Sequence, residues 1–96
     1  MSSRAQARRI LIVDDEPAIR RFLSHLFRSE GYDTVTAADG EEALALVKRE
    51  SLDVVLLDIQ MPGLDGFGVL REIKKLNRTL PVIMATADGR VPHVVA

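Results

Sequence analysis

The stretch Ile10-Leu11-Ile12-Val13-Asp14-Asp15 decides the fold, because an unbroken apolar run passes directly into two acidic residues. Four such apolar runs occur along the 96 residues, and a helical stretch follows each of the first three. The runs are rich in β-branched residues and do not alternate with polar ones, which is typical of strands buried on both faces of a parallel sheet. The runs are Ile10–Val13, Thr34–Ala37, Val54–Leu57 and Val82–Ala85.

Helical periodicity fills each interval between these runs. The first helix is predicted over Pro17–Glu30, with proline in the first turn and Gly31 as the C-terminal stop. The second is expected to begin near Glu41 behind an N-cap at Asp39, and the third near Gly66. The apolar positions at helical spacing are Ile19, Phe22, Leu23, Leu26 and Phe27, then Ala43, Leu44 and Val47, then Phe67, Leu70, Ile73 and Leu76.

Strands and helices that alternate in this way predict an α/β fold with a doubly wound parallel sheet. Right-handed crossovers place helices on both faces of such a sheet. The flavodoxin-like strand order 2-1-3-4 is one of the two common orders for this class. In that order strands one, three and four are neighbours, about 4.8 Å apart. We therefore expect one domain with a single core.

Polar residues follow three of the runs: Asp14 and Asp15 the first, Asp58 the third and Thr86 the fourth. The carboxyl ends of parallel strands meet at one edge of the sheet, so these side chains should converge there. Carboxylates that lie this near to one another either take up protons or hold a cation between them. Oxygen ligands with room for water suit Mg²⁺ better than Zn²⁺. A bound Mg²⁺ ion beside a hydroxyl that can donate a hydrogen bond is an arrangement suited to phosphoryl transfer.

Simpler interpretations exist for each polar residue taken singly. An aspartate after a strand is commonly a turn or capping residue, and Asp15 or Glu16 could cap the first helix. The glycine-rich segment 62–68 lacks the position and spacing of a phosphate-binding loop, which favours a turn. His25 is expected on the polar side of the first helix and His93 at the surface, so neither is predicted to bind a metal.

Composition excludes several other classes of protein. There is no cysteine, so disulfides and thiolate metal sites are absent. The formal net charge of −1 offers no electrostatic reason to expect nucleic acid or an anionic membrane as a partner. No apolar stretch approaches the roughly 20 residues of a membrane span, and a cytoplasmic location is the default expectation. Residues 1–8 are expected to be a flexible tail ahead of one domain over 9–96.

The chain resembles the receiver domains of two-component response regulators, including the chemotaxis regulators, in three segments. These segments are ILIVDDEP (10–17), VVLLDIQMPGLDG (54–66) and PVIMATA (81–87). The resemblance implies a phospho-acceptor signalling domain in which Asp58 receives a phosphoryl group from a sensor histidine kinase or a phosphotransfer protein. It implies that Asp14, Asp15, Asp58 and the backbone carbonyl of Gln60 position Mg²⁺. Thr86 would hydrogen-bond the phosphoryl oxygens. Such a domain is regulatory and is not an enzyme beyond assisting its own phosphorylation and dephosphorylation.

The chain departs from this family at its C-terminal end. The fifth strand, which ends in lysine in complete receivers, and the fifth helix are expected to be missing. Residues 90–96 would form only the opening turn of a fourth helix, and strand four (Val82–Ala85) would be an exposed edge. We therefore predict a homodimer or a segment-exchanged oligomer.

Two other functions remain open from the residues alone. The first is an unphosphorylated receiver fragment that acts as an interaction or dimerisation module through its exposed strand-four edge. The second is an Mg²⁺-dependent phosphatase with an aspartyl nucleophile. The phosphatase is disfavoured because Gln60 stands where such an enzyme needs a second acid.

Overall fold

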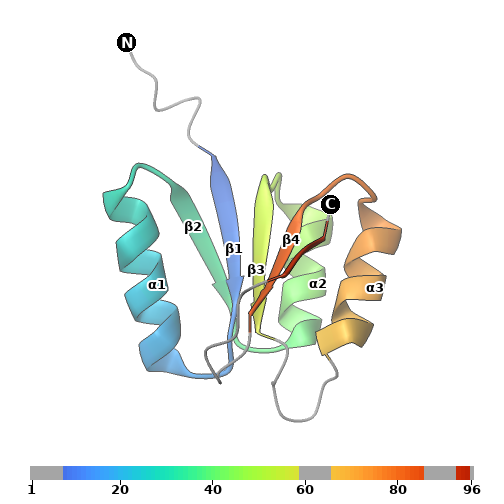
Figure 1. Cartoon of the computed structure of the whole chain (residues 1–96), viewed down its shortest axis with the longest axis horizontal. Coiled ribbons are helices and arrows are strands. Elements are labelled where there is room, and N and C mark those ends of the chain that lie inside the picture. The colour runs from blue at the N-terminus through green and yellow to red at the C-terminus, as the bar shows by residue number, and fades with distance from the viewer. Residues whose placement is uncertain (1–7, 59–65, 86–92, 96) are drawn as a thin grey trace.

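The computed structural model describes residues 8–58, 66–85 and 93–95 (Figure 1). Strands and helices alternate along the chain as far as the fourth strand, and all the described strands belong to one sheet. The elements are β1 (Arg9–Val13), α1 (Pro17–Ser29), β2 (Asp33–Ala37), α2 (Gly40–Arg49), β3 (Val54–Asp58), α3 (Gly66–Leu76), β4 (Val82–Ala85) and β5 (His93–Val95).

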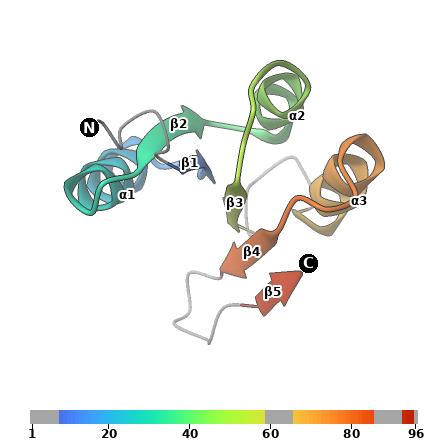
Figure 2. The same ribbon diagram turned by 90° about the horizontal axis from the view of Figure 1, so that it is seen from above.

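The sheet has the order β2-β1-β3-β4-β5, and its first four strands are parallel. The predicted order 2-1-3-4 and the doubly wound α/β class are therefore confirmed. Helices cover both faces: α1 lies on one, and α2 and α3 lie on the other (Figure 2). Because the four strands are parallel, their carboxyl ends share one edge of the sheet, which is where ligands bind in folds of this class.

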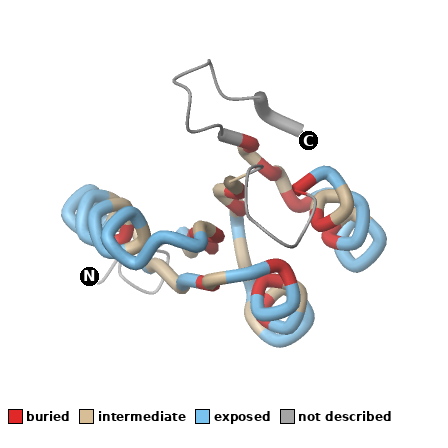
Figure 3. The backbone as a smooth tube through the Cα atoms, turned by 90° about the horizontal axis from the view of Figure 1, so that it is seen from below, coloured by how far each residue is buried: buried red, intermediate tan, exposed pale blue. Residues whose placement is uncertain are grey.

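The centre of the core is β1, where Leu11–Val13 are at most 1% exposed. This strand is buried on both faces, as its unbroken apolar sequence predicts. β3 differs, because Val55 and Leu57 are fully buried while Val54 and Leu56 are only half-buried. The reason is the placement of α1, which covers β1 and β2 and leaves the same face of β3 and β4 without a described helix (Figures 2 and 3).

The helix ends agree with the predicted boundaries. Pro17 occupies the start of α1, and Gly31, with a φ of 96°, follows its end in the left-handed conformation that glycine favours. At the start of α2, Asp39 Oδ1 accepts a 2.8 Å hydrogen bond from the Glu42 backbone N–H. Glu42 reaches back, and its Oε1 accepts a 2.7 Å bond from the Ala38 N–H. No described helix is both long and apolar enough to cross a membrane.

Two phenylalanines among the apolar residues at helical spacing are exposed: Phe22 of α1 by 64% and Phe67 of α3 by 54%. On α3 the buried line runs through Val69 and Ile73. At about 100° per residue, Phe67 lies about 200° around the helix from Val69, which turns it away from the sheet. Three further apolar residues at helical spacing are also exposed, namely Ile19, Leu26 and Leu76.

The C-terminal residues differ most from expectation. Residues 90–96 were predicted to open a helix, but His93–Val95 form β5, which pairs antiparallel with β4 through Ile83 and Val94. The prediction of an exposed strand-four edge is therefore wrong. A strand edge presents unpaired N–H and C=O groups, and the β-branched Val94 and Val95 favour the extended backbone that satisfies them. β5 is not the parallel fifth strand that the resemblance implies, because its direction is opposite.

We predict that Asp39→Ala lowers the free energy of unfolding by about 1 kcal/mol, because the substitution leaves the first turn of α2 without its side-chain acceptor. Urea denaturation followed by circular dichroism measures the change. The matched control is Glu41→Ala, which removes an exposed acid from the same turn without a capping bond and should cost only a few tenths of a kcal/mol. Equal losses in the two variants would show that charge, rather than the cap, accounts for the effect.

Candidate functional site

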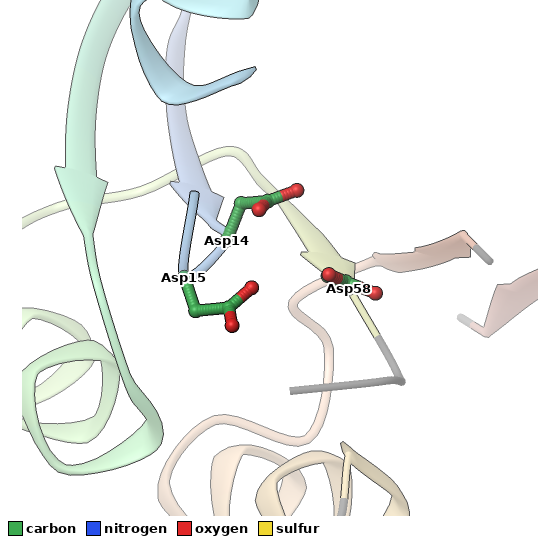
Figure 4. A group of neighbouring side chains, drawn as sticks. All are labelled: Asp14, Asp15 and Asp58. Carbon is green, nitrogen blue, oxygen red and sulfur yellow. The ribbon is translucent and has the colours of Figure 1, made fainter. Parts of the chain in front are cut away.

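Three carboxylates meet at the carboxyl edge of the sheet. Asp14 and Asp15 follow β1, Asp58 ends β3, and one ligand oxygen from each lies within 4.8 Å of the other two (Figure 4). The parallel pairing of β1 with β3 produces this arrangement, because Val13 and Leu57 are register partners and the acids come directly after them. The convergence predicted for these three residues is thus present in the structure.

The Asp14 backbone and side chain are held from three directions. Its N–H donates to the Ala37 carbonyl at 3.1 Å, and its own carbonyl accepts a 2.7 Å bond from the Arg20 guanidinium. Its Oδ1 accepts a 2.9 Å bond from the Glu16 N–H. Of the two residues considered as caps of α1, Glu16 occupies the N-cap position but makes no side-chain capping bond, and its backbone N–H donates to the Asp14 carboxylate. The Asp14 side chain therefore both stabilises the turn before α1 and belongs to the acidic cluster.

Arg20 is a site neighbour that the sequence interpretation missed. Arg20 lies six residues after Asp14, and neither helical nor strand periodicity indicates a contact between the two. Its contact is with a backbone carbonyl, so no pairing of opposite side-chain charges indicates it. Its effect is to fix the turn that presents Asp14 and Asp15.

Burial raises the pKa of Asp14 above its ordinary value of 3.8. The Glu16 N–H bond opposes this shift, while the negative charges of Asp58 and Asp15 add to it. Both upward effects have the same origin, because the fold brings carboxylates together in a half-buried place. At neutral pH the charged cluster therefore opposes folding unless a cation compensates it.

The ligand set fits a hard divalent cation. All three groups are carboxylates, and the cluster contains no imidazole or thiol that would favour a softer metal. In an octahedral Mg²⁺ site neighbouring ligand oxygens are about 3 Å apart and opposite ones about 4.2 Å apart, so these carboxylate oxygens, which lie within 4.8 Å of one another, would draw closer around a bound ion. Asp15 is exposed and Asp14 and Asp58 are half-buried, which leaves one side open to water or to a ligand.

Two predicted site residues, Gln60 and Thr86, lie outside the described residues, and the structure gives no geometry for either. The register places Ala85 opposite Asp58, so the chain reaches Thr86 immediately after the residue that pairs with the site. The roles of Gln60 and Thr86 stay predictions.

Comparison with known proteins agrees with this fold and site. The family model of the response regulator receiver domain matches residues 10–96. A probable transcriptional regulator, ycf27, of Guillardia theta is 54% identical over 83 residues, which are 86% of this chain and 32% of that protein. The sporulation initiation phosphotransferase F of Bacillus subtilis (strain 168) is 45% identical over 86 residues, 90% of this chain and 69% of that protein. The chain spans about a third of the length of the ycf27 relatives it matches.

Solved structures show the same likeness in three dimensions. The response regulator TrrA of Thermotoga maritima, in complex with Mg²⁺ and BeF, superposes with a TM-score of 0.79 at 46% identity, over 83% of this chain and 70% of that one. A second structure, of the histidine kinase ThkA in complex with TrrA, gives a TM-score of 0.80 at 44% identity, over 86% of this chain and 72% of the matched one. The fold and the acidic edge define a regulatory domain of the two-component class. This chain belongs to the response regulator receiver domain family.

We predict that Asp14→Asn stabilises the metal-free protein at pH 7, as measured by urea denaturation in the presence of a chelator. A carboxyl group whose pKa is raised in the folded state stabilises the fold only while it is protonated, and this contribution is lost as the pH rises through the raised value. Asparagine stays neutral at every pH and still accepts the Glu16 N–H bond.

The stabilisation should disappear below pH 3.8, where the aspartate is protonated in both states. Glu41→Gln, an exposed substitution with the same charge change on α2, is the control and should show no such pH-dependent gain. A loss of stability at pH 7 in Asp14→Asn would contradict the conclusion that burial and repulsion between carboxylates make the charged Asp14 side chain unfavourable in the folded protein.

Proposed function

We propose that this chain is a phospho-acceptor signalling domain in which Asp58 receives a phosphoryl group in an Mg²⁺-dependent reaction. The observation that carries the proposal is the convergence of three carboxylates from β1 and β3 within 4.8 Å. The donor is a histidine kinase or a phosphotransfer protein. The complex of ThkA with the related TrrA supports a kinase as the partner class, and the name of the Bacillus subtilis phosphotransferase supports a phosphorelay.

The positions of the three acids favour Asp58 as the acceptor. Asp14 commits one carboxylate oxygen to the Glu16 N–H, and Asp15 is exposed at the rim. Asp58 ends the central strand β3, so its carboxylate lies at the carboxyl edge of the sheet with a parallel strand on either side. A phosphoryl group bound there would be close to Asp14 and Asp15.

The reaction transfers the phosphoryl group from an imidazole nitrogen of the donor to an oxygen of Asp58. The P–N bond of the donor breaks, a P–O bond forms, and the product is an acyl phosphate on the aspartate. Bound Mg²⁺ would supply charge neutralisation for the phosphoryl oxygens. Asp14, Asp15 and Asp58, with the backbone carbonyl of Gln60, would hold it, and Thr86 would donate a hydrogen bond to a phosphoryl oxygen. The domain contributes catalysis only to its own phosphorylation and dephosphorylation.

The proposed domain covers residues 9–96, with 1–8 as a tail, and a cytoplasmic location stays a prediction. The alternative module that associates through an open strand-four edge loses its basis, because β5 occupies that edge. The homodimer and the absence of direct nucleic-acid binding are untested predictions. The ycf27 relatives are about three times as long as the matched region, and what they regulate is a property of those longer proteins.

Acetyl phosphate with Mg²⁺ should add one phosphoryl group to the wild-type chain, as measured by intact mass spectrometry. Asp58→Asn should carry none, because the amide cannot accept the group. Asp33→Asn is the matched control, since Asp33 is an exposed aspartate at the opposite edge of the sheet, and it should be modified as fully as the wild type. An equal adduct on Asp58→Asn, or none on a folded wild-type chain, would contradict the proposal.

Mg²⁺ should also raise the stability of the unphosphorylated chain. A ligand that binds only the folded state stabilises it by about 2.7 kcal/mol at about 100 times its Kd. The thermal midpoint should therefore rise with Mg²⁺ concentration in the wild type and in Asp33→Asn, and much less in Asp58→Asn. An equal rise in all three proteins would place the ion elsewhere.

A further inference from the structure

A second polar site runs along α1 on the side of β2, and it begins beside the acidic edge, where Arg20 contacts the Asp14 carbonyl. A groove of about 440 Å³ runs there, and α1 and β2 lie side by side at this end of the sheet (Figures 1 and 2). Its volume falls within the range of small-molecule sites, which is about 300–1,000 Å³. The residues that line it are Pro17, Arg20, Arg21, Ser24, His25, Arg28 and Thr36.

The charge of this groove has one sign. Three arginines and a histidine line it and no acid does, and α1 contains no aspartate or glutamate from Pro17 to Ser29. Within the described residues, no salt bridge involves Arg20, Arg21 or Arg28. The three guanidinium charges lie on one helix with no acid among them, so they make the local potential positive and attract an anion. Salt screens this attraction over about 8 Å at physiological ionic strength.

Two features order the groove before a ligand arrives. The Arg20 guanidinium is fixed by its 2.7 Å bond to the Asp14 carbonyl. Ser24 is only 8% exposed, and its Oγ shares a 2.7 Å hydrogen bond with Thr34 Oγ1 on β2, which ties the helix to the strand beneath the groove. A preformed site costs less ordering entropy on binding than a set of mobile surface side chains.

The spacing of the arginines indicates the shape of the ligand. Arg21 and Arg28 are two turns apart on one side of α1, about 10 Å along its axis, with His25 between them. One phosphoryl group would engage only one end, whereas two or more linked groups can engage both. The acids Asp14 and Asp15 lie beyond the Pro17 end, so the negative charge of a ligand should concentrate toward Arg28.

Recognition in this groove would depend on phosphoryl groups and not on a nucleobase. Guanidinium groups bind phosphate oxygens in a bidentate manner, and hydroxyls such as that of Thr36 add neutral donors. No phenylalanine, tyrosine or tryptophan lines the groove, and the imidazole of His25 is the single aromatic ring among the lining residues, so the surface on which a base could stack is small. We propose that the α1–β2 groove is a binding site for anions with two or more linked phosphoryl groups.

This proposal does not rest on the phospho-acceptor function. Inorganic triphosphate is the probe, titrated into the whole chain by isothermal titration calorimetry with EDTA present, so that no metal bridges the anion to the acidic edge. We expect saturable one-to-one binding that weakens as salt is raised. The Asp58→Asn protein should bind equally well, which separates this result from the fate of the acceptor site.

The decisive variants are Arg21→Gln and Arg28→Gln, each expected to weaken triphosphate binding about tenfold. Both side chains are exposed, so circular dichroism should show an unchanged fold. Arg71→Gln is the matched control, because Arg71 is an exposed arginine on α3 and its loss changes the net charge equally. ATP should bind as tightly as triphosphate if only the phosphates are recognised, and more tightly if nucleotides are the source of the anion.

Two results would overturn the proposal. One is the absence of saturable binding of triphosphate to the wild-type chain. The other is an equal loss of affinity in Arg28→Gln and Arg71→Gln, which would show that the anion responds to overall charge and not to this groove.

Discussion

The parallel pairing of β1 with β3 is the constraint on which the rest of the structure depends. Register partners run from Ile10 and Val54 to Val13 and Leu57, and this ladder places two strands that are 44 residues apart in sequence side by side. The pairing buries Leu11 and Val55 at the centre of the core. It also ends both strands at the same level, so the acids that follow them cannot avoid one another. The same hydrogen-bond ladder thus organises the core and assembles the site.

The acidic edge therefore opposes folding while apolar burial favours it. Burial of the half-exposed Asp14 and the charges of Asp58 and Asp15 raise the pKa of the Asp14 carboxyl, so the neutral-pH protein holds its negative charges together at a cost. Buried strands on either side fix the carboxylates in place and prevent them from separating. A cluster of carboxylates of this kind attracts a cation. The carboxylate cluster thus lowers the stability of the fold at the edge of the sheet where the candidate site lies.

Much of this could be predicted from sequence because the signals were local or topological. The run Ile10–Val13 followed by Asp14 and Asp15 marks a buried strand and its functional end at once. Asp39 and Glu42 mark the start of α2 by direct hydrogen bonds between near neighbours. Right-handed crossovers limit the possible sheet orders, so strand neighbours follow without any knowledge of side-chain packing.

What could not be predicted depends on which surfaces meet. Helical spacing counts apolar residues but does not say which of them a sheet covers, and Phe22 and Phe67, which both fit the helical spacing, are exposed. The pairing of His93–Val95 with β4 is a contact between a strand edge and the segment after it, and a short apolar run reads equally well as a helix start. The turn role of Asp14 was hidden for a different reason, because one side chain serves both the turn and the site.

The most direct test of the central claim is a titration of the unphosphorylated chain with Mg²⁺, followed residue by residue through backbone amide chemical shifts. If β1 and β3 together hold one cation site, the amides of Asp14, Asp15 and Asp58 should shift most among the assigned signals and follow a single binding curve. Shifts confined to one of the two strand ends, or two separate curves, would contradict the account, because they would mean that the strand pairing does not create a shared site.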